Sequence, residues 1–374
     1  MWVWYEIPVM DLRSIREQAQ PNAATWGDET EIREGEMKRR EVLSGVALVG
    51  LMPAINKGGN LEHRPNIAMT RDGLEISDYG ARLFQNWAVA ATHGQSTRAL
   101  LGDVHADFLV TRSLTLRANG RSRQQEGYRV MAWQGVLLTT LYTRLGDIRQ
   151  ARQSANVARE FGYQCGDRAA VASAYDRESI AEIWYGAPEL GVQAATRGIR
   201  AIQNETATHY RPILAGLNSQ AMVHYARSPE YLELSQQYER RVLDWQQRMP
   251  ETRRPNAFDL TPSQMYNSLA IAHAFRQQTD ASELFATGFR ATGYAAQERV
   301  VFRKLLRLNQ AWAEAPRNPR GAIEIASDVM RSFGRNEAPP DPIYRDRATR
   351  TIHAVPDSVP PEWTAELRIL VGRP

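Results

Sequence analysis

Histidines, the side chains that most often carry metal or acid–base chemistry, are present but scattered. The chain has seven of them, and no two stand at the i, i+4 spacing that places two metal ligands on one face of a helix. His224 and His273 fall within expected helices, next to Tyr225 and Ala274, so we interpret them as hydrogen-bonded packing residues. The histidines therefore predict no metal site.

Motifs for nucleophilic catalysis and for phosphate binding are also missing from the sequence. It contains neither a GxSxG elbow nor a GxxxxGK[ST] loop, and "GVALVG" (residues 45–50) is not followed by Lys and Ser or Thr. Asp176 and Glu178 are neighbouring carboxylates that solvated helix charge explains, and Cys165, the single cysteine, has no partner for an intramolecular disulfide. We therefore expect a protein that is not an enzyme and uses no cofactor.

Asparagine is the polar residue with the most informative placement, because it recurs in three expected helical hairpins. The three are Asn218 in "AGLNSQAM", Asn267 in "MYNSLAIA" and Asn309 in "LRLNQAWA". An amide side chain both donates and accepts hydrogen bonds, so a ladder of exposed asparagines can bind a peptide backbone. Three arginines are lesser candidates, for binding a carboxylate: Arg177, Arg211 and Arg303. The alternative is that the asparagines are ordinary residues of solvated helix faces.

The segments that must position these side chains are helical. Residues 76–334 form a succession of amphipathic runs, each ended by Gly, Pro, Asn or Asp, and no run alternates apolar and polar residues long enough to predict a strand. The clearest unit spans residues 128–162. Its first helix has an apolar face, "LGD" predicts a turn, and its second helix has a face of small residues: Ala151, Ala155 and Ala158. Small residues there let two helices approach closely.

This unit resembles a tetratricopeptide repeat. The residues that carry the resemblance are the large Leu138 and Tyr142, the turn at Gly146-Asp147, and the small Ala151 and Ala158. It departs from the repeat at Thr139, where the family has Gly or Ala, and in lacking a closing proline. The next hairpin turns at Gly186 and places Gly191 and Gly198 at the same offsets as the two alanines. The turns lie 40 residues apart, against about 34 in the family, so the repeats are degenerate.

Looser helical pairs follow over residues 210–245, 262–294 and 296–333, which makes five hairpins. The resemblance implies an all-α, TPR-like right-handed superhelix of stacked hairpins, whose first helices line a peptide-binding groove. The expected organisation is an N-terminal extension and linker (1–60), capping helices (61–127), TPR-like repeats (128–334) and a proline-rich C-terminal tail (335–374). Prolines in the tail are expected to block helix before "TAELRIL", a last helix or strand.

A basic triplet before an apolar stretch, "KRREVLSGVALVGL" (residues 38–51), has the head and the apolar run of an export signal. The chain then continues as "PAINKGG", without a small-residue cleavage site, and an N-terminal signal would require Met37 as the start. We interpret residues 37–55 as a short linker helix and keep an atypical export signal as the alternative. Apolar stretches fall short of the roughly 20 residues that span a bilayer, so we expect no integral membrane association.

Residues 37–334 also resemble the C-terminal part of actinobacterial regulators, in which a Cro/repressor-type helix-turn-helix domain precedes a degenerate tetratricopeptide array. "MKRREVLSGVALVGL" and then "LFQNWAVAATHGQSTRALLGDVHADFLVTRSLTL" carry this resemblance, whereas residues 1–36 show no helix-turn-helix pattern. It implies a non-enzymatic cytoplasmic sensor that binds a peptide or protein in transcriptional regulation. The alternatives are an exported or membrane-surface scaffold, and a regulator that binds DNA through an unrecognised segment.

The charge balance does not indicate a nucleic-acid-binding surface. The net charge is +4, and the basic residues are interleaved with 42 acidic ones along the expected helices, which is typical of solvated, partly paired helix faces. We therefore expect DNA contact only indirectly or through an unrecognised segment. The sequence leaves a monomer and a homodimer equally open.

Overall fold

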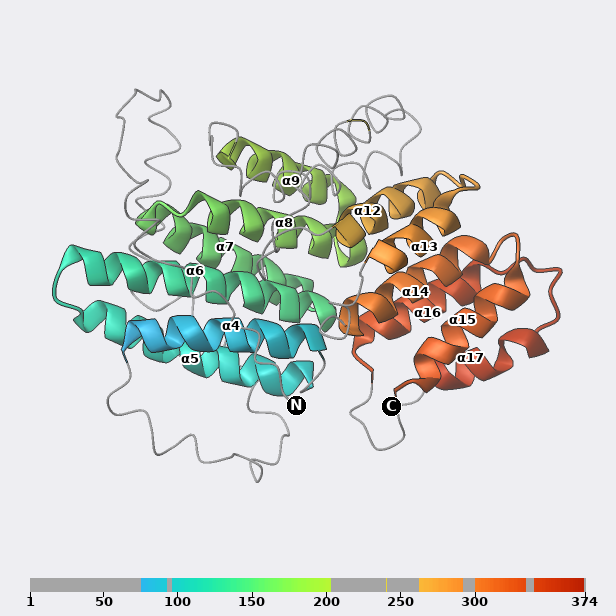
Figure 1. Cartoon of the computed structure of the whole chain (residues 1–374), viewed down its shortest axis with the longest axis horizontal. Helices are drawn as coiled ribbons and strands as arrows, with labels where there is room; N and C mark the ends of the chain where they lie inside the picture. The colour runs from blue at the N-terminus through green and yellow to red at the C-terminus, as the bar shows by residue number, and fades with distance from the viewer. Residues whose placement is uncertain are drawn as a thin grey trace. The chain divides into compact units, whose positions relative to one another are not determined.

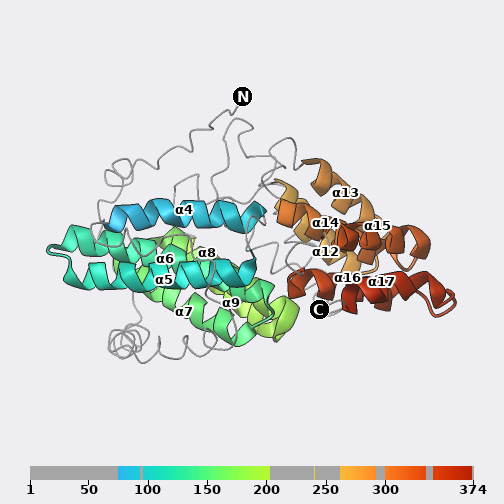
Figure 2. The ribbon, with the colours of Figure 1, turned by 90° about the horizontal axis from the view of Figure 1, so that it is seen from below.

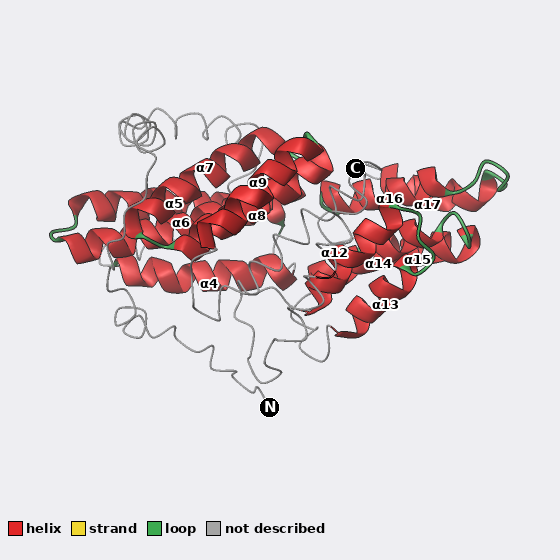
Figure 3. Ribbon diagram, turned by 90° about the horizontal axis from the view of Figure 1, so that it is seen from above, coloured by secondary structure: helices red, strands yellow, loops and turns green. Residues whose placement is uncertain are grey.

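The computed structural model describes residues 75–92, 96–202, 240, 262–291, 300–333 and 340–372. Within these ranges the chain forms twelve α-helices and no strand, which confirms the predicted all-α class for this part of the protein (Figures 1 and 3). The first six helices are α4 (Ile76–Thr92), α5 (Thr97–Arg117), α6 (Arg121–Arg144), α7 (Ile148–Cys165), α8 (Arg168–Tyr185) and α9 (Pro188–Ile202). The other six are α12 (Pro262–Phe275), α13 (Ala281–Ala291), α14 (Val300–Glu314), α15 (Pro319–Arg331), α16 (Pro342–Ala354) and α17 (Glu362–Gly372).

The turn predicted within residues 128–162 joins α6 to α7. Gly146 adopts a positive φ of 73°, a conformation that favours glycine, and so reverses the chain. Asp147 follows as the N-cap of α7, and its carboxylate accepts a hydrogen bond of 3.0 Å from the backbone N–H of Gln150. The "LGD" segment therefore ends one helix and starts the next by local chemistry.

Small residues bring α6 and α7 close together, as the sequence predicts. Ala151, Ala155 and Ala158 are all fully buried. A Cβ atom added to Gly135 of α6 would lie 2.9 Å from the Cβ of Ala158, closer than real Cβ contacts allow. The two backbones are therefore in near contact, and a larger side chain at either position has no room.

The next hairpin, α8 and α9, repeats this construction and turns at Gly186 as predicted. Its first helix is capped by Asp167, which accepts a hydrogen bond of 3.0 Å from the backbone N–H of Ala170. Gly191, one of the predicted small positions, is buried, and a Cβ there would lie 2.9 Å from Cγ1 of Ile183. Close packing of α9 against α8 therefore depends on the glycine at position 191.

Two later hairpins, α12–α13 and α14–α15, occupy the predicted pairs over residues 262–294 and 296–333. The second turns where predicted, with Asn318 capping α15 by accepting a hydrogen bond of 3.1 Å from the backbone N–H of Gly321. The pair predicted over residues 210–245, apart from Arg240, and the segment 37–55 lie outside the described residues.

The expectation that prolines block helix near the C-terminus is wrong at Pro342, where α16 begins. Proline suits the first turn of a helix because its missing N–H would have no helical partner there. "TAELRIL" lies in α17, so of the two outcomes considered it is a helix. Tyr344 of α16 and Leu367 of α17 are fully buried in a core shared with α14 and α15.

The two capping helices predicted before the first repeat are α4 and α5, which pack against each other and against α6 (Figure 2). Asp107 of α5 joins them, since its 5% exposed carboxylate accepts hydrogen bonds from Arg82 and Asn86 of α4. None of the described helices is long and apolar enough to cross a membrane.

Candidate functional site

A shallow pocket of about 220 Å³ lies where the C-terminal part of α13 and α15 meet the start of α14. It is lined by Phe289, Arg303, Lys304, Arg307 and Val329. Three of these five residues are cationic and none is acidic. The pocket therefore combines a positive charge with an apolar wall.

All three cations come from the first two turns of α14, within "VVFRKLLR". Arg303 and Arg307 stand four residues apart, so they project from the same face of the helix. The start of a helix carries a partial positive charge from its unpaired backbone N–H groups. The three cationic side chains therefore add their charge to the partial positive charge at the start of α14.

An aromatic ring holds the two arginines in place. The guanidinium carbon of Arg303 lies 4.8 Å from the ring centroid of Phe289, and that of Arg307 lies 5.5 Å from the same centroid. Both distances are within the roughly 6 Å range of a cation–π interaction. Lys304 lies over a different ring, with its Nζ 3.7 Å from the centroid of Phe333.

Neither pocket arginine forms an ion pair with a carboxylate among the residues that the structure describes. Arg307 donates a hydrogen bond of 2.7 Å to Oε1 of Gln310, which is a neutral acceptor. Arg303 is held in this part of the chain by Phe289 alone. The guanidinium groups therefore retain donors for an external anion.

No family model, curated protein or solved structure matches this chain. What the pocket can bind is therefore inferred from its own residues.

Of the predicted binding residues that the structure describes, only Arg303 lines this pocket. Sequence reasoning missed Lys304, Arg307 and Phe289. The segment "RKLLR" contains a partial signal, since it carries three cations and no acid. Phe289 belongs to the preceding helix, and its contact with α14 is not visible in the order of the residues.

Two of the three asparagines predicted to form an exposed ladder are paired with each other. Nδ2 of Asn309 in α14 donates a hydrogen bond of 3.0 Å to Oδ1 of Asn267 in α12. Asn309 is only 3% exposed, so the expectation that its side chain is solvent-exposed is wrong. The helical repeat of α14 also turns Asn309 well away from the face that carries Arg303. Asn218 lies outside the described residues.

Arg177, another predicted binding residue, does not line the pocket. Arg177 lies on α8, where its Nε is 3.7 Å from Oδ2 of its sequence neighbour Asp176. Burial raises the pKa of Asp176 above its ordinary value, and the adjacent guanidinium opposes that shift. Arg177 therefore compensates a carboxylate within its own helix. Arg211 lies outside the described residues.

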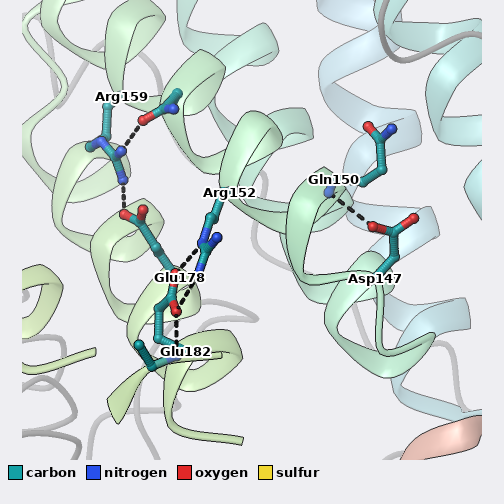
Figure 4. Close-up of polar contacts among 8 residues, drawn as sticks. Asp147, Gln150, Arg152, Arg159, Glu178 and Glu182 are labelled. Atoms are coloured by element: carbon teal, nitrogen blue, oxygen red, sulfur yellow. Dashed lines mark hydrogen bonds and ion pairs between the residues drawn. The ribbon is translucent and has the colours of Figure 1, made fainter. Parts of the chain in front are cut away.

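Glu178, one of the two carboxylates interpreted as solvated charge, is instead part of an ionic contact between α7 and α8 (Figure 4). Glu178 accepts a hydrogen bond from Arg159, and its side chain is 17% exposed. One turn later, Glu182 is 2% exposed, binds Arg152 through both oxygens and also accepts from the backbone N–H of Ala187. The two ion pairs link α7 to α8, and the contact between Glu182 and Ala187 begins the next turn. The role of these side chains is structural.

The histidines in the described part of the chain are buried packing residues or lie apart from one another. Nδ1 of His273 lies 2.8 Å from Oδ1 of Asp280, in agreement with the predicted hydrogen-bonded role. Nε2 of His105 lies 2.7 Å from the hydroxyl of Tyr142, and burial lowers the pKa of His105 to about 4. The described residues contain no cluster of His, Cys, Asp and Glu suited to a metal ion.

Proposed function

We propose that this chain is a non-enzymatic regulatory module that binds a peptide or protein through an anionic group of that partner. The proposed architecture is a TPR-like right-handed superhelix of stacked hairpins, and the proposed setting is a sensor in transcriptional regulation in the cytoplasm. The binding site is the pocket of Phe289, Arg303, Lys304, Arg307 and Val329.

The observation that carries this proposal is the pairing state of Arg303 and Arg307. Four arginines of the described chain pair with a carboxylate of another helix: Arg82–Asp107, Arg152–Glu182, Arg159–Glu178 and Arg331–Glu366. Two others meet a neutral partner, since Arg144 donates to the backbone carbonyl of Ala90 and Arg347 lies over the ring of Trp184. The two pocket arginines instead lie over one phenyl ring, beside a cavity whose accessible lining is mainly apolar. Two adjacent cations for which the described residues supply no counter-ion repel each other, and an anionic ligand removes that cost.

The TPR-like part of the proposal is supported by the repeated use of small residues. Ala151 and Gly191 lie at equivalent offsets after the turns of two successive hairpins; Ala151 is fully buried, and a Cβ on Gly191 would clash with Ile183 of the helix that precedes the turn. Repeat arrays of this kind offer extended surfaces that bind peptides and proteins. A stack of helical hairpins binds a partner in this way without any catalytic residue.

Capture of partners by charge-reversal variants tests the proposal. The wild-type chain, the Arg303→Glu/Arg307→Glu variant and the Arg320→Glu variant are used to capture proteins from the native host, and mass spectrometry identifies them. Arg320 is the control because it lies on α15, is 77% exposed and pairs only with Glu324 in the described chain. We expect a partner that binds wild type and Arg320→Glu but not the double variant, with binding weakened by salt.

Two results would argue against the proposal, and one control is required. A partner that binds all three forms equally places binding elsewhere on the protein. Retention of DNA by the purified chain, with a steep salt dependence, favours the DNA-binding alternative. A circular dichroism melt of the double variant must show the wild-type transition, since loss of the fold would remove binding for an unrelated reason.

A further inference from the structure

We infer that the contact of α16 with α5 and α8 is a releasable joint, at which helices α14 to α17 move away from α5 and α8 while the chain stays folded. The joint is formed by Thr97 of α5, Trp184 of α8, and Asp341 and Arg347 of α16. None of these residues lines the pocket of the proposed function, so the joint and the pocket can be tested separately.

The joint is held by polar contacts. The hydroxyl of Thr97 donates a hydrogen bond of 2.6 Å to Oδ2 of Asp341, the N-cap residue of α16. Farther along α16, the guanidinium carbon of Arg347 lies 3.1 Å from the ring centroid of Trp184, and that of Arg350 lies 5.1 Å from the same centroid. A hydrogen bond that water can replace and a cation–π contact each contribute little net stability. The joint is therefore weak relative to an apolar core.

The contact of α16 with its own neighbours is such a core. Tyr344 and Ala348 of α16 are fully buried in one apolar cluster with Leu308 of α14 and Leu367 of α17. Burial of apolar surface is the dominant stabilising contribution in folding. Helices α14 to α17 should therefore move as one body, and the polar contacts of α16 are where that body separates from the rest.

Closing the joint removes charged and polar groups from water. Arg347 is 2% exposed, and its ion pair in the described chain is with its sequence neighbour Asp346, at 2.9 Å. Burial lowers the pKa of Arg347 to about 10 and raises the pKa of Asp341 above its ordinary value. The hydroxyl of Tyr185, whose charge would interact with Arg347, is buried without a hydrogen-bond partner among the described residues. Hydration of these groups on opening offsets the contacts that are lost.

An apolar contact keeps the two groups of helices connected when the joint opens. Ile183 of α8 belongs to one buried cluster with Phe285 of α13 and Leu306 of α14. Trp184 also lies beside Phe275 of α12, with ring centroids 6.2 Å apart. These contacts do not involve α16, so they can act as the pivot. Polar contact areas within one chain permit relative motion of this kind, on the microsecond to millisecond timescale.

NMR relaxation dispersion of tryptophan indole N–H signals tests the inference on the full chain, with Trp184→Phe and Trp133→Phe assigning the two signals. Trp133 is the control, because its indole donates a hydrogen bond of 3.1 Å to Asp167 between α6 and the start of α8, away from α16. We expect dispersion for Trp184, whose ring loses Arg347 on opening, and a flat profile for Trp133. A flat profile for Trp184, or equal dispersion at the two rings, overturns the inference.

A matched pair of threonine variants locates the motion. Thr97→Val keeps the shape of the side chain but removes the donor to Asp341, so it should raise the population of the open form by about three- to tenfold. Thr115→Val, in the same helix, removes a buried hydroxyl that donates to a carbonyl of its own helix, and should leave the dispersion of Trp184 unchanged. Unchanged dispersion in folded Thr97→Val, or an equal rise in both variants, contradicts the joint. If Thr97→Val does not fold, the wild-type comparison of the two indoles decides.

Discussion

Gly135 and Ala158 meet where α6 and α7 pack, and a Cβ atom on Gly135 would lie 2.9 Å from the Cβ of Ala158. Ala158 is fully buried, and its own backbone N lies 3.1 Å from the same added atom. Neither helix can accept another methyl group at this contact without moving. The separation of the two helices is therefore set by these two side chains.

Enlarging either residue should destabilise the protein. We expect Gly135→Ala and Ala158→Leu each to lower the free energy of unfolding by about 1 to 3 kcal/mol, because overpacking forces the helices apart. Urea unfolding followed by circular dichroism measures the change. Gly102→Ala in α5 is the control, since a Cβ there meets nothing within 4 Å and removing a helical glycine should stabilise by roughly 0.5 to 1 kcal/mol. Equal effects at Gly102 and Gly135 would refute the close contact.

His105 should make stability depend on pH. Burial lowers its folded-state pKa from 6.5 to about 4, so between these values the unfolded chain binds the proton more readily than the folded one. Stability should therefore fall by up to about 3 kcal/mol as the pH drops from 6.5 to 4. His105→Gln should flatten the curve in this window. Tyr142→Phe should keep it, because burial rather than the contact with Tyr142 lowers the pKa.

The Asn267–Asn309 pair should behave as structural rather than as an exposed binding ladder. Asn309→Ala and Asn267→Ala should each cost about 1 to 2 kcal/mol of stability, because either change leaves a largely buried amide without its partner. The double variant should cost less than the sum, with a coupling of about 0.5 to 1.5 kcal/mol in a thermodynamic cycle. Losses below about 0.5 kcal/mol would instead indicate the exposed asparagines that the sequence suggests.

The Arg152–Glu182 pair should show a rescue. Glu182 is 2% exposed whereas Arg152 is 41% exposed, so removing the arginine strands a buried carboxylate. We expect Arg152→Ala to lower the free energy of unfolding by about 3 to 5 kcal/mol. Adding Glu182→Gln should restore part of this loss, since the neutral amide carries no charge and still accepts from the backbone N–H of Ala187. Thermal and urea unfolding of the three forms check the order, and a double variant less stable than Arg152→Ala contradicts it.

Helices and turns were the most predictable features because their causes are local. The Gly146-Asp147 turn follows from a left-handed glycine and a capping carboxylate within a few residues of each other. The burial of Ala151 and Ala158 follows from the helical period. Pro342 shows where local reasoning fails. A proline interrupts the interior of a helix but suits its first turn, so its position relative to the start of the helix decides its effect.

Side-chain partners were not predictable, because they come from residues far apart in the chain. The amide of Asn309 is paired with a residue of α12, and Glu178 with a residue of α7, although each resembles a solvated polar residue in the sequence. Arg303 was singled out from its type alone, and only the approach of Phe289 from α13 gives it a place in a pocket. By itself the sequence determined the helices, their turns and their small-residue contacts, since these depend on neighbouring residues. Which polar side chains are buried in pairs and which face a cavity was decided by the packing of helices against one another.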